Sequence, residues 1–301
     1  MQNKIVIITG ASDGIGAATA RLLHARGASV IIVGHAEQKT KAVARELNAP
    51  YYLADFAKLD EVRQLAAQLR KDYAHIDVLV NNAGGVFGAR ELTVDGHEKT
   101  LQVNHLAPFL LTSLLMDILI DSQAVVINTS SAASRFLSDL DINDLETENK
   151  YSPRKAYGNS KLENILFTKE LHNRYHARGI STAAFHPGNV ASNFAANSTS
   201  PMRIAYHTPL KYLFGFISPK TGADTLVWLA TSTSGTDWQS GEYYYKRKLA
   251  KTVDKAYDAN LAKLLWDKSE EMLARLFPGG EKHVQFSKIK TDKNIKYCQL
   301  Q

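Results

Sequence analysis

The chain has 301 residues, of which 45% are hydrophobic and 22% charged, and its formal net charge is +6. This composition is ordinary for a soluble globular protein. A single cysteine, Cys298, excludes an intrachain disulfide framework, and the longest apolar runs are too short to cross a bilayer. No secretory signal pattern opens the chain, so we expect a cytoplasmic protein.

Short apolar runs alternate with segments of helical periodicity along the first half, which is typical of βαβ units on a parallel sheet. The runs are continuous rather than alternating, as expected for strands covered on both faces. The predicted strands are Lys4–Thr9, Ala28–Val33, Tyr51–Leu53, Val78–Val80, Ala124–Asn128 and Ser181–Phe185. The predicted helices are Gly14–Arg26, Glu61–Tyr73, Glu98–Ile120, Pro153–Ala177, Lys220–Ala230 and Asp254–Leu276.

These elements predict an α/β fold, a single-domain Rossmann-type doubly wound parallel sheet with helices on both faces, over residues 1–277. The segment at about 191–218 is rich in aromatic residues and is expected to form a substrate lid together with Phe136, Leu137 and Phe87, although such aromatic residues are equally typical of a core. Residues 278–301 are expected to form a polar tail.

A glycine-rich turn lies between the first predicted strand and the first predicted helix. Its GxxxGxG spacing differs from the common GxGxxG fingerprint. Glycine permits a tight turn and a close approach of the backbone to a pyrophosphate, and the helix start offers free N–H groups. Glycines also occur in ordinary turns, but this position favours dinucleotide binding. The predicted cofactor-binding residues of the turn are Gly10, Ser12, Asp13, Gly14, Ile15 and Gly16.

Tyr157 and Lys161 stand four residues apart, on one face of the long helix predicted over 153–177. A free tyrosine has a pKa of about 10, and a neighbouring ammonium stabilises the phenolate and lowers that pKa. The pair is therefore a candidate for proton transfer to or from a hydroxyl or carbonyl oxygen. Taken alone, it would more often be a surface Tyr–Lys pair.

The order of several motifs resembles that of short-chain dehydrogenases/reductases. The matching segments are TGASDGIG at Thr9–Gly16, NNAG at Asn81–Gly84, INTSS at Ile127–Ser131 and YGNSK at Tyr157–Lys161. The resemblance extends to Val190 and implies an oxidoreductase that transfers a hydride between a nicotinamide cofactor and a carbonyl or alcohol, with no metal.

The resemblance also implies the catalytic roles. Tyr157 would be the general acid/base, and Lys161 would support it and contact the nicotinamide ribose. Ser131 matches the serine that holds the substrate oxygen, with Ser130 as the alternative in register. Asn104 matches the helix asparagine that anchors a water linked to the lysine.

Further cofactor contacts follow from the same resemblance. Asp55 matches the carboxylate that binds the adenine amino group, and the backbone of Val190 would bind the carboxamide. Without the resemblance, these positions would be a helix cap and strand-end turns. The implied cofactor-binding residues outside the glycine turn are Asp55, Phe56, Asn82, Ala83, Gly84, Tyr157, Lys161, Pro187, Gly188 and Val190.

The end of the second predicted strand indicates which cofactor is preferred. A carboxylate there would hold the ribose 2′-hydroxyl of NAD, but His35 stands at this place and no acid follows until Glu37. His35, Lys39 and Ser12 are candidates to contact a 2′-phosphate. NADP(H) is therefore preferred. NAD(H) stays the alternative because many NADP-using relatives have arginine where His35 stands, and His35 could be only an exposed loop residue.

The 25 residues between Ser131 and Tyr157, with WDKSEEML near the C-terminus, are similar to the retinol-dehydrogenase-like branch. This similarity implies a small lipophilic carbonyl or alcohol substrate. The membrane anchor of animal retinoid enzymes is not seen, so a soluble enzyme with no membrane span is expected.

Other readings stay open. A non-catalytic NADP(H)-sensing regulator would have the same fold, and a nucleotide-sugar epimerase would have a different glycine spacing. A nucleic-acid partner would rest on net charge alone, so none is expected. Relatives often pair through helices like those predicted at 98–120 and 153–177, so a homo-oligomer is an open alternative.

Overall fold

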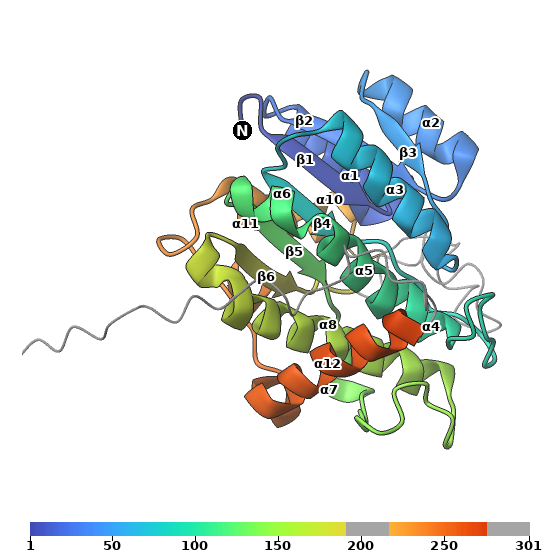
Figure 1. Cartoon of the computed structure of the whole chain (residues 1–301). Helices are drawn as coiled ribbons and strands as arrows, with labels where there is room; N and C mark the ends of the chain where they lie inside the picture. Colours follow the sequence, from blue (N-terminus) through green and yellow to red (C-terminus); the bar gives the residue numbers. More distant parts are fainter. Residues whose placement is uncertain (191–216, 276–301) are drawn as a thin grey trace, which may run out of the picture.

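Eight strands form one sheet in the order β3-β2-β1-β4-β5-β6-β7-β8, as the computed structural model shows (Figure 1). The structure describes residues 1–190 and 217–275. The predicted lid, apart from its last two residues, and the predicted tail therefore lie outside the described residues. Strands β1 to β7 run parallel to their neighbours, and β8 is antiparallel. The strands are β1 Ile5–Thr9, β2 Ser29–Gly34, β3 Tyr51–Leu53, β4 Val78–Asn81, β5 Val125–Thr129, β6 Ser181–Phe185, β7 Glu242–Tyr245 and β8 Lys248–Leu249.

Helices cover both faces of the sheet, because successive residues of each strand point to opposite sides. The core on one face contains residues of α3, α5, α8 and α12, and the core on the other contains residues of α1, α2 and α11. The α-helices are α1 Gly14–His24, α2 Glu37–Glu46, α3 Leu59–Asp72, α4 Lys99–Leu101, α5 Ala107–Leu114, α6 Met116–Asp121, α7 Ala133–Phe136, α8 Pro153–Tyr175, α10 Pro219–Gly222, α11 Asp224–Thr231 and α12 Ala259–Arg275. The predicted doubly wound α/β architecture is confirmed.

The expectation of one continuous helix over 98–120 is wrong. A π-helical turn, Gln102–Leu106, separates α4 from α5, and the helix breaks again at Leu115. Pro108 explains the first interruption, because proline has no N–H to donate to the carbonyl of Asn104 four residues earlier. The backbone N–H of Ala107 instead bonds to the carbonyl of Gln102, five residues back.

Two strands at the sheet edge were not predicted. The segment 243–251 has the letters YYYKRKLAK, and its positive charge alone favours an exposed surface. Its first half is instead the strand β7, which pairs with β6, and a tight turn returns the chain as β8. Smaller differences are that the helix expected over 220–230 is divided into α10 and α11, and that a 3-10 turn precedes α12.

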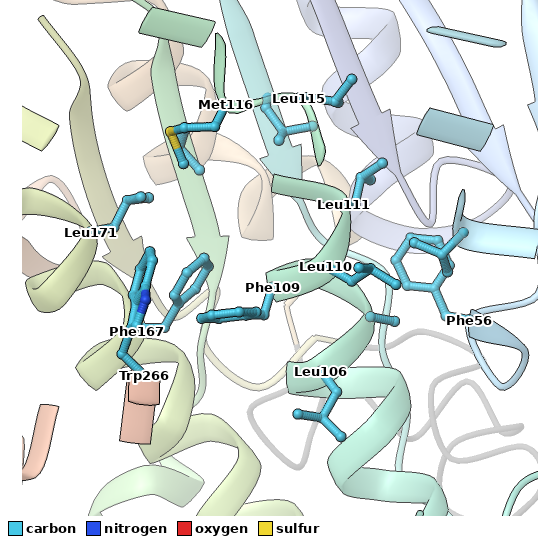
Figure 2. Close-up of a cluster of buried hydrophobic side chains, with 14 of the residues drawn as sticks. Phe56, Leu106, Phe109, Leu110, Leu111, Leu115, Met116, Phe167, Leu171 and Trp266 are labelled. Carbon is cyan, nitrogen blue, oxygen red and sulfur yellow. The ribbon is translucent and has the colours of Figure 1, made fainter. Parts of the chain in front are cut away.

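An aromatic cluster fixes α12 against α8 and α5 (Figure 2). Trp266 of α12 is 1% exposed and packs against Phe109 and Phe167, with ring centroids 4.8 Å and 5.7 Å away. The guanidinium of Arg174 lies 4.7 Å from the centre of the indole, and His105 shares a 2.8 Å hydrogen bond with Ser269. These contacts hold α12 on the helix that carries the candidate catalytic pair. Within residues 1–190 and 217–275, no helix combines the length and the apolar character that a membrane span requires.

A buried carboxyl also lies in α8. Glu163 is 1% exposed, and among the described residues neither of its carboxylate oxygens has a hydrogen-bond partner. Burial, reinforced by the nearby Glu98 and Glu146, raises the pKa of Glu163 well above its usual range. The folded chain therefore favours the protonated form of this carboxyl.

We expect Glu163→Gln to remove a pH dependence of stability. The unfolded carboxyl has a pKa of about 4.5. Because the folded state binds this proton more tightly, its stabilising contribution is fully present below that pKa. The contribution is lost as the pH rises from the unfolded pKa through the folded pKa, and between them the unfolding free energy of wild type falls by about 1.4 kcal/mol per pH unit. Glutamine has no such proton to lose, so the stability of the variant relative to wild type should grow with pH.

Urea unfolding at about pH 5 and about pH 8 measures the effect. The control is Glu271→Gln, which changes a carboxyl that is 57% exposed on α12 and should keep the wild-type dependence. An identical fall in unfolding free energy for Glu163→Gln and wild type would show that Glu163 does not carry the linkage.

Candidate active site

The glycine turn forms a cradle where β1 meets α1. Gly10 and Gly14 have φ of +65° and +55°, a region that residues with a Cβ rarely adopt. A Cβ at Gly16 would lie 2.3 Å from the carbonyl oxygen of Gly10, so only glycine fits. The bare backbone at the start of an 11-residue helix fits a pyrophosphate, which needs N–H donors and close approach. This observation agrees with the predicted cofactor turn.

The segment after β4 braces this cradle. The Thr9 hydroxyl oxygen accepts hydrogen bonds from the backbone N–H groups of Asn82 and Ala83, both at 3.0 Å. The Asn82 amide donates to the carbonyls of Thr9 and Gly10 at 3.0 and 3.3 Å. Asn82 and Ala83 thus lie beside the turn, and their contact with a cofactor stays a prediction. Their contacts shape the cradle, and Thr9 is a structural partner that the sequence analysis did not single out.

The residues predicted to select the cofactor lie near the carboxyl end of β2 and the start of α1. His35 is exposed directly after β2, and Ser12 packs against Gly34, where a Cβ would lie 3.0 Å from the serine Cβ. Lys39 points to Asp13, with 3.0 Å between its Nζ and a carboxylate oxygen. Asp13 also accepts from the N–H of Gly14, so its side chain caps α1. The Lys39–Asp13 pair is about half exposed, and such pairs hold weakly enough to exchange for another anion.

Asp55 and Phe56, which are predicted to bind the cofactor, make contacts within the fold. The carboxylate of Asp55 accepts from the N–H of Ala57 at 3.0 Å, which closes a local turn. The Phe56 ring is 5% exposed in the core, beside Leu110 in Figure 2, so only its backbone is available for a ligand. Both roles remain predictions.

Lys161 lies buried beside Tyr157 near the carboxyl end of β5. Its side chain is 2% exposed, and its Nζ donates to the carbonyl of Thr129 at 3.2 Å. The same Nζ lies 5.5 Å from the centre of the Tyr157 ring, so the predicted pair is brought together. Burial lowers the pKa of Lys161 to about 8, so the ammonium form still predominates at neutral pH.

The π-helical turn positions Asn104 behind this pair. The Asn104 amide donates to the carbonyl of Gly85 at 3.0 Å and to the Ser160 hydroxyl at 3.0 Å, and its oxygen accepts from the N–H of Gly85. Gly84 permits the approach, because a Cβ there would lie 2.8 Å from the Asn104 oxygen and 3.3 Å from the Lys161 Nζ. Asn104 therefore joins Gly85, directly after the NNAG segment, to the helix that carries the candidate catalytic pair.

The two serines after β5 have different environments. Ser130 is 1% exposed, and its hydroxyl donates to the carbonyl of Lys161 at 2.7 Å. Ser131 is half-buried, and its hydroxyl accepts from the N–H of Ala133 at 3.2 Å. The buried Ser130 hydroxyl is occupied within the fold, which favours Ser131 as the residue that meets a substrate.

Tyr243 of β7 closes this side of the site. Its hydroxyl donates to the carbonyl of Ser131 at 3.1 Å. Burial raises the pKa of Tyr243, and the nearby Tyr157 contributes in the same direction. Tyr243 is a site residue that was not predicted, because the basic character of residues 243–251 favours an exposed surface. Three adjacent tyrosines were the available signal for a β-strand.

The segment after β6 approaches the glycine turn. Gly188 has a φ of +87°, and Val190 is buried and forms a bridge to Ile217. A Cβ at Gly222 of α10 would lie 2.6 Å from Val190 and 3.5 Å from Ile15. The loops after β1 and β6 therefore meet at α10. The candidate residues thus converge at the carboxyl end of the sheet, around the switch point between β1 and β4, where open α/β sheets bind ligands.

Comparisons with known proteins agree with this arrangement. The sequence model of a family described as short chain dehydrogenase matches residues 4–203. Retinol dehydrogenase 14 of Homo sapiens is 33% identical over 92% of this chain and 88% of the human protein. A provisionally named daunorubicin C-13 ketoreductase of Streptomyces sp. (strain C5) is 36% identical over 89% of this chain and 92% of its own length.

Solved structures extend the comparison. A protein of Mycobacterium paratuberculosis superposes with a TM-score of 0.72 at 31% identity, covering 90% of this chain and 93% of the other. A Beutenbergia cavernae protein, provisionally named an NAD(P)-dependent gluconate 5-dehydrogenase, gives a TM-score of 0.60 at 25% identity over 76% and 90% of the two chains. The latter structure contains NADP at low occupancy.

Proposed function

The chain belongs to the short-chain dehydrogenase family and is an NAD(P)-dependent oxidoreductase of CH–OH and carbonyl groups, and we propose that it prefers NADP(H), acts on a lipophilic substrate and uses Tyr157 as general acid/base. The observation that carries the proposal is the buried Lys161 ammonium, 5.5 Å from the centre of the Tyr157 ring. A cation beside a phenol stabilises the phenolate, which lets tyrosine exchange a proton at neutral pH.

Each group has a defined task in the reducing direction. The bound cofactor supplies the hydride. Tyr157 donates its proton to the carbonyl oxygen, Ser131 donates a hydrogen bond to that oxygen, and Lys161 stabilises the phenolate left behind. The backbone of the glycine turn holds the pyrophosphate, and the loop at 187–190 holds the nicotinamide end. Oxidation of an alcohol reverses the proton's path.

A lipophilic substrate is supported by the similarity to retinol dehydrogenase 14 and to the named ketoreductase. The test is a screen of NADPH oxidation with retinoids, steroids, aromatic ketones and quinones, together with the matching alcohols and NADP⁺. Turnover of apolar compounds is the expected result. Tight NADPH binding with no turnover across the panel would instead favour a non-catalytic cofactor sensor.

NADP(H) preference is supported by the absence of an acid at the end of β2. We expect His35→Asp to weaken NADPH binding by about tenfold or more and to strengthen NADH binding, because a carboxylate repels the 2′-phosphate and accepts from a ribose 2′-hydroxyl. Titration of both cofactors into wild type and variant measures the dissociation constants.

The control for this prediction is His24→Asp. It introduces the same charge in the last turn of α1, far from the carboxyl end of the sheet. This variant should leave both dissociation constants near their wild-type values. Tighter binding of NADH than NADPH by wild type would overturn the proposed preference.

A further inference from the structure

A recess of about 480 Å³ opens beside the candidate catalytic serine. We call it the hairpin recess, because it is lined by α7 and by the β7–β8 hairpin. Its walls include Phe136, Tyr243 and Tyr245, and His186 stacks on Tyr245 with 3.9 Å between ring centroids. The Tyr243 hydroxyl bonds to Ser131, so the recess adjoins the proposed site of reaction. Its size falls within the range of small-molecule sites.

Cationic side chains line the same recess. They are Arg135, Lys246, Lys248 and Lys251. Among the described residues no acidic side chain lines the recess, and the three lysines have no ion-pair partner in that part of the chain. Uncompensated cations around a low-dielectric hollow concentrate a positive potential inside it. The recess is therefore apolar in its walls and positive at its rim.

The turn between β7 and β8 has an unfavourable backbone conformation. Tyr245 pairs with Lys248, so Lys246 and Arg247 form a two-residue turn, with φ of +48° and +60°. Turns of this kind prefer Asn-Gly, because positive φ costs a residue with a Cβ about 1–2 kcal/mol. Turn propensity therefore does not explain these residues. Arg247 pairs with Asp224, whereas the Lys246 ammonium lies 5.2 Å from the centre of the Tyr245 ring in the recess wall.

We propose that the hairpin recess binds an anionic group of the substrate, so that the preferred substrate is an apolar carbonyl or alcohol compound that bears a carboxylate, sulfate or phosphate. The aromatic walls take the apolar body, and the lysines form charge-assisted hydrogen bonds with the anion. This assignment rests on the proposed function of the adjoining site and adds the class of substrate to it.

A matched pair of ketones tests the assignment. The probes are 4′-acetylbiphenyl-4-carboxylate and its methyl ester, which differ in charge at one end. Calorimetric titration into the NADP⁺-loaded chain measures binding, and NADPH oxidation measures turnover separately. We expect the carboxylate to bind about 10- to 100-fold more tightly than the ester at low salt, as charge-assisted hydrogen bonds allow. The preference should weaken as salt is added.

The variant removes three of the four rim cations, the three lysines, without touching the candidate catalytic groups. In Lys246→Gln/Lys248→Gln/Lys251→Gln, all three positions are exposed, and the carboxylate should lose its advantage. Unchanged ester binding shows that this variant is folded. The control is Lys71→Gln, an exposed lysine at the end of α3, a helix that packs against α5 and not against the β7–β8 hairpin, which should keep the wild-type preference.

The outcomes separate the alternatives. Equal binding of acid and ester by wild type, or a preference that survives in the triple variant, overturns the assignment. Preferential binding without reduction of either ketone supports the anion site while counting against the proposed catalysis. Sedimentation of wild type, but not of the triple variant, with vesicles of about 30% phosphatidylserine, together with no preference between the probes, would identify a membrane-facing surface and overturn a substrate site.

Discussion

Tyr157→Phe is expected to lower kcat by about 10²- to 10⁴-fold while leaving the NADPH dissociation constant within about threefold of wild type. The substitution removes only the phenolic oxygen, so the ring next to Lys161 stays in place. If Tyr157 provides the proton in wild type, the substrate oxygen in the variant develops negative charge with no acid to neutralise it. The loss should therefore appear in kcat and not in cofactor binding.

The measurement is NADPH oxidation at saturating cofactor with the best substrate of the carbonyl screen. Tyr257→Phe is the matched control. Tyr257 is 52% exposed, and the centre of its ring lies 5.4 Å from the Nζ of Lys169 rather than next to Lys161. It should keep near-normal kcat. A Tyr157→Phe enzyme that retained near-normal kcat would remove Tyr157 from proton transfer.

Trp266→Ala is expected to cost about 3–5 kcal/mol of unfolding free energy, the range for truncating a buried aromatic side chain. The indole is 1% exposed and packs against Phe109 and Phe167 (Figure 2). Its Nε1 donates to the Glu270 carboxylate at 2.8 Å, and Arg174 covers its face. Truncation would leave a cavity between α12, α5 and α8 and would strand these polar partners.

Urea unfolding measures this effect, with Leu264→Ala as the control on the same helix. Leu264 is 47% exposed, so its truncation should change the unfolding free energy by only about 0.5 kcal/mol. A loss below about 1 kcal/mol for Trp266→Ala would mean that α12 is not an integral part of the core.

The sheet and the proximity of Tyr157 and Lys161 were predictable because their signals are local. The apolar runs of β1, β2 and β5 need helices on both faces wherever they lie. The turn between β1 and α1 needs glycine for steric reasons that act within a few residues. Tyr157 and Lys161 share a face through helical spacing alone. Such features depend little on distant parts of the chain.

The remaining features depend on distant contacts. Tyr243 becomes buried only because β7 pairs with β6 and its hydroxyl reaches Ser131, which no local pattern indicates. The π-helical turn could have been suspected from Pro108, but the partners of Asn104, at Gly85 and Ser160, lie 19 and 56 residues away along the chain. Glu163 likewise gave no signal of burial, because glutamate is ordinarily a surface residue of helices.

The position of α12 has a consequence for self-association. A homo-oligomer that pairs through the helices predicted over 98–120 and 153–177 was an open alternative from the sequence. In this chain, the aromatic face of those helices is already covered by Trp266 from its own C-terminal region. A second copy could reach that face only by displacing α12. A homodimer that keeps this helix docked therefore cannot use the aromatic face that Trp266 covers.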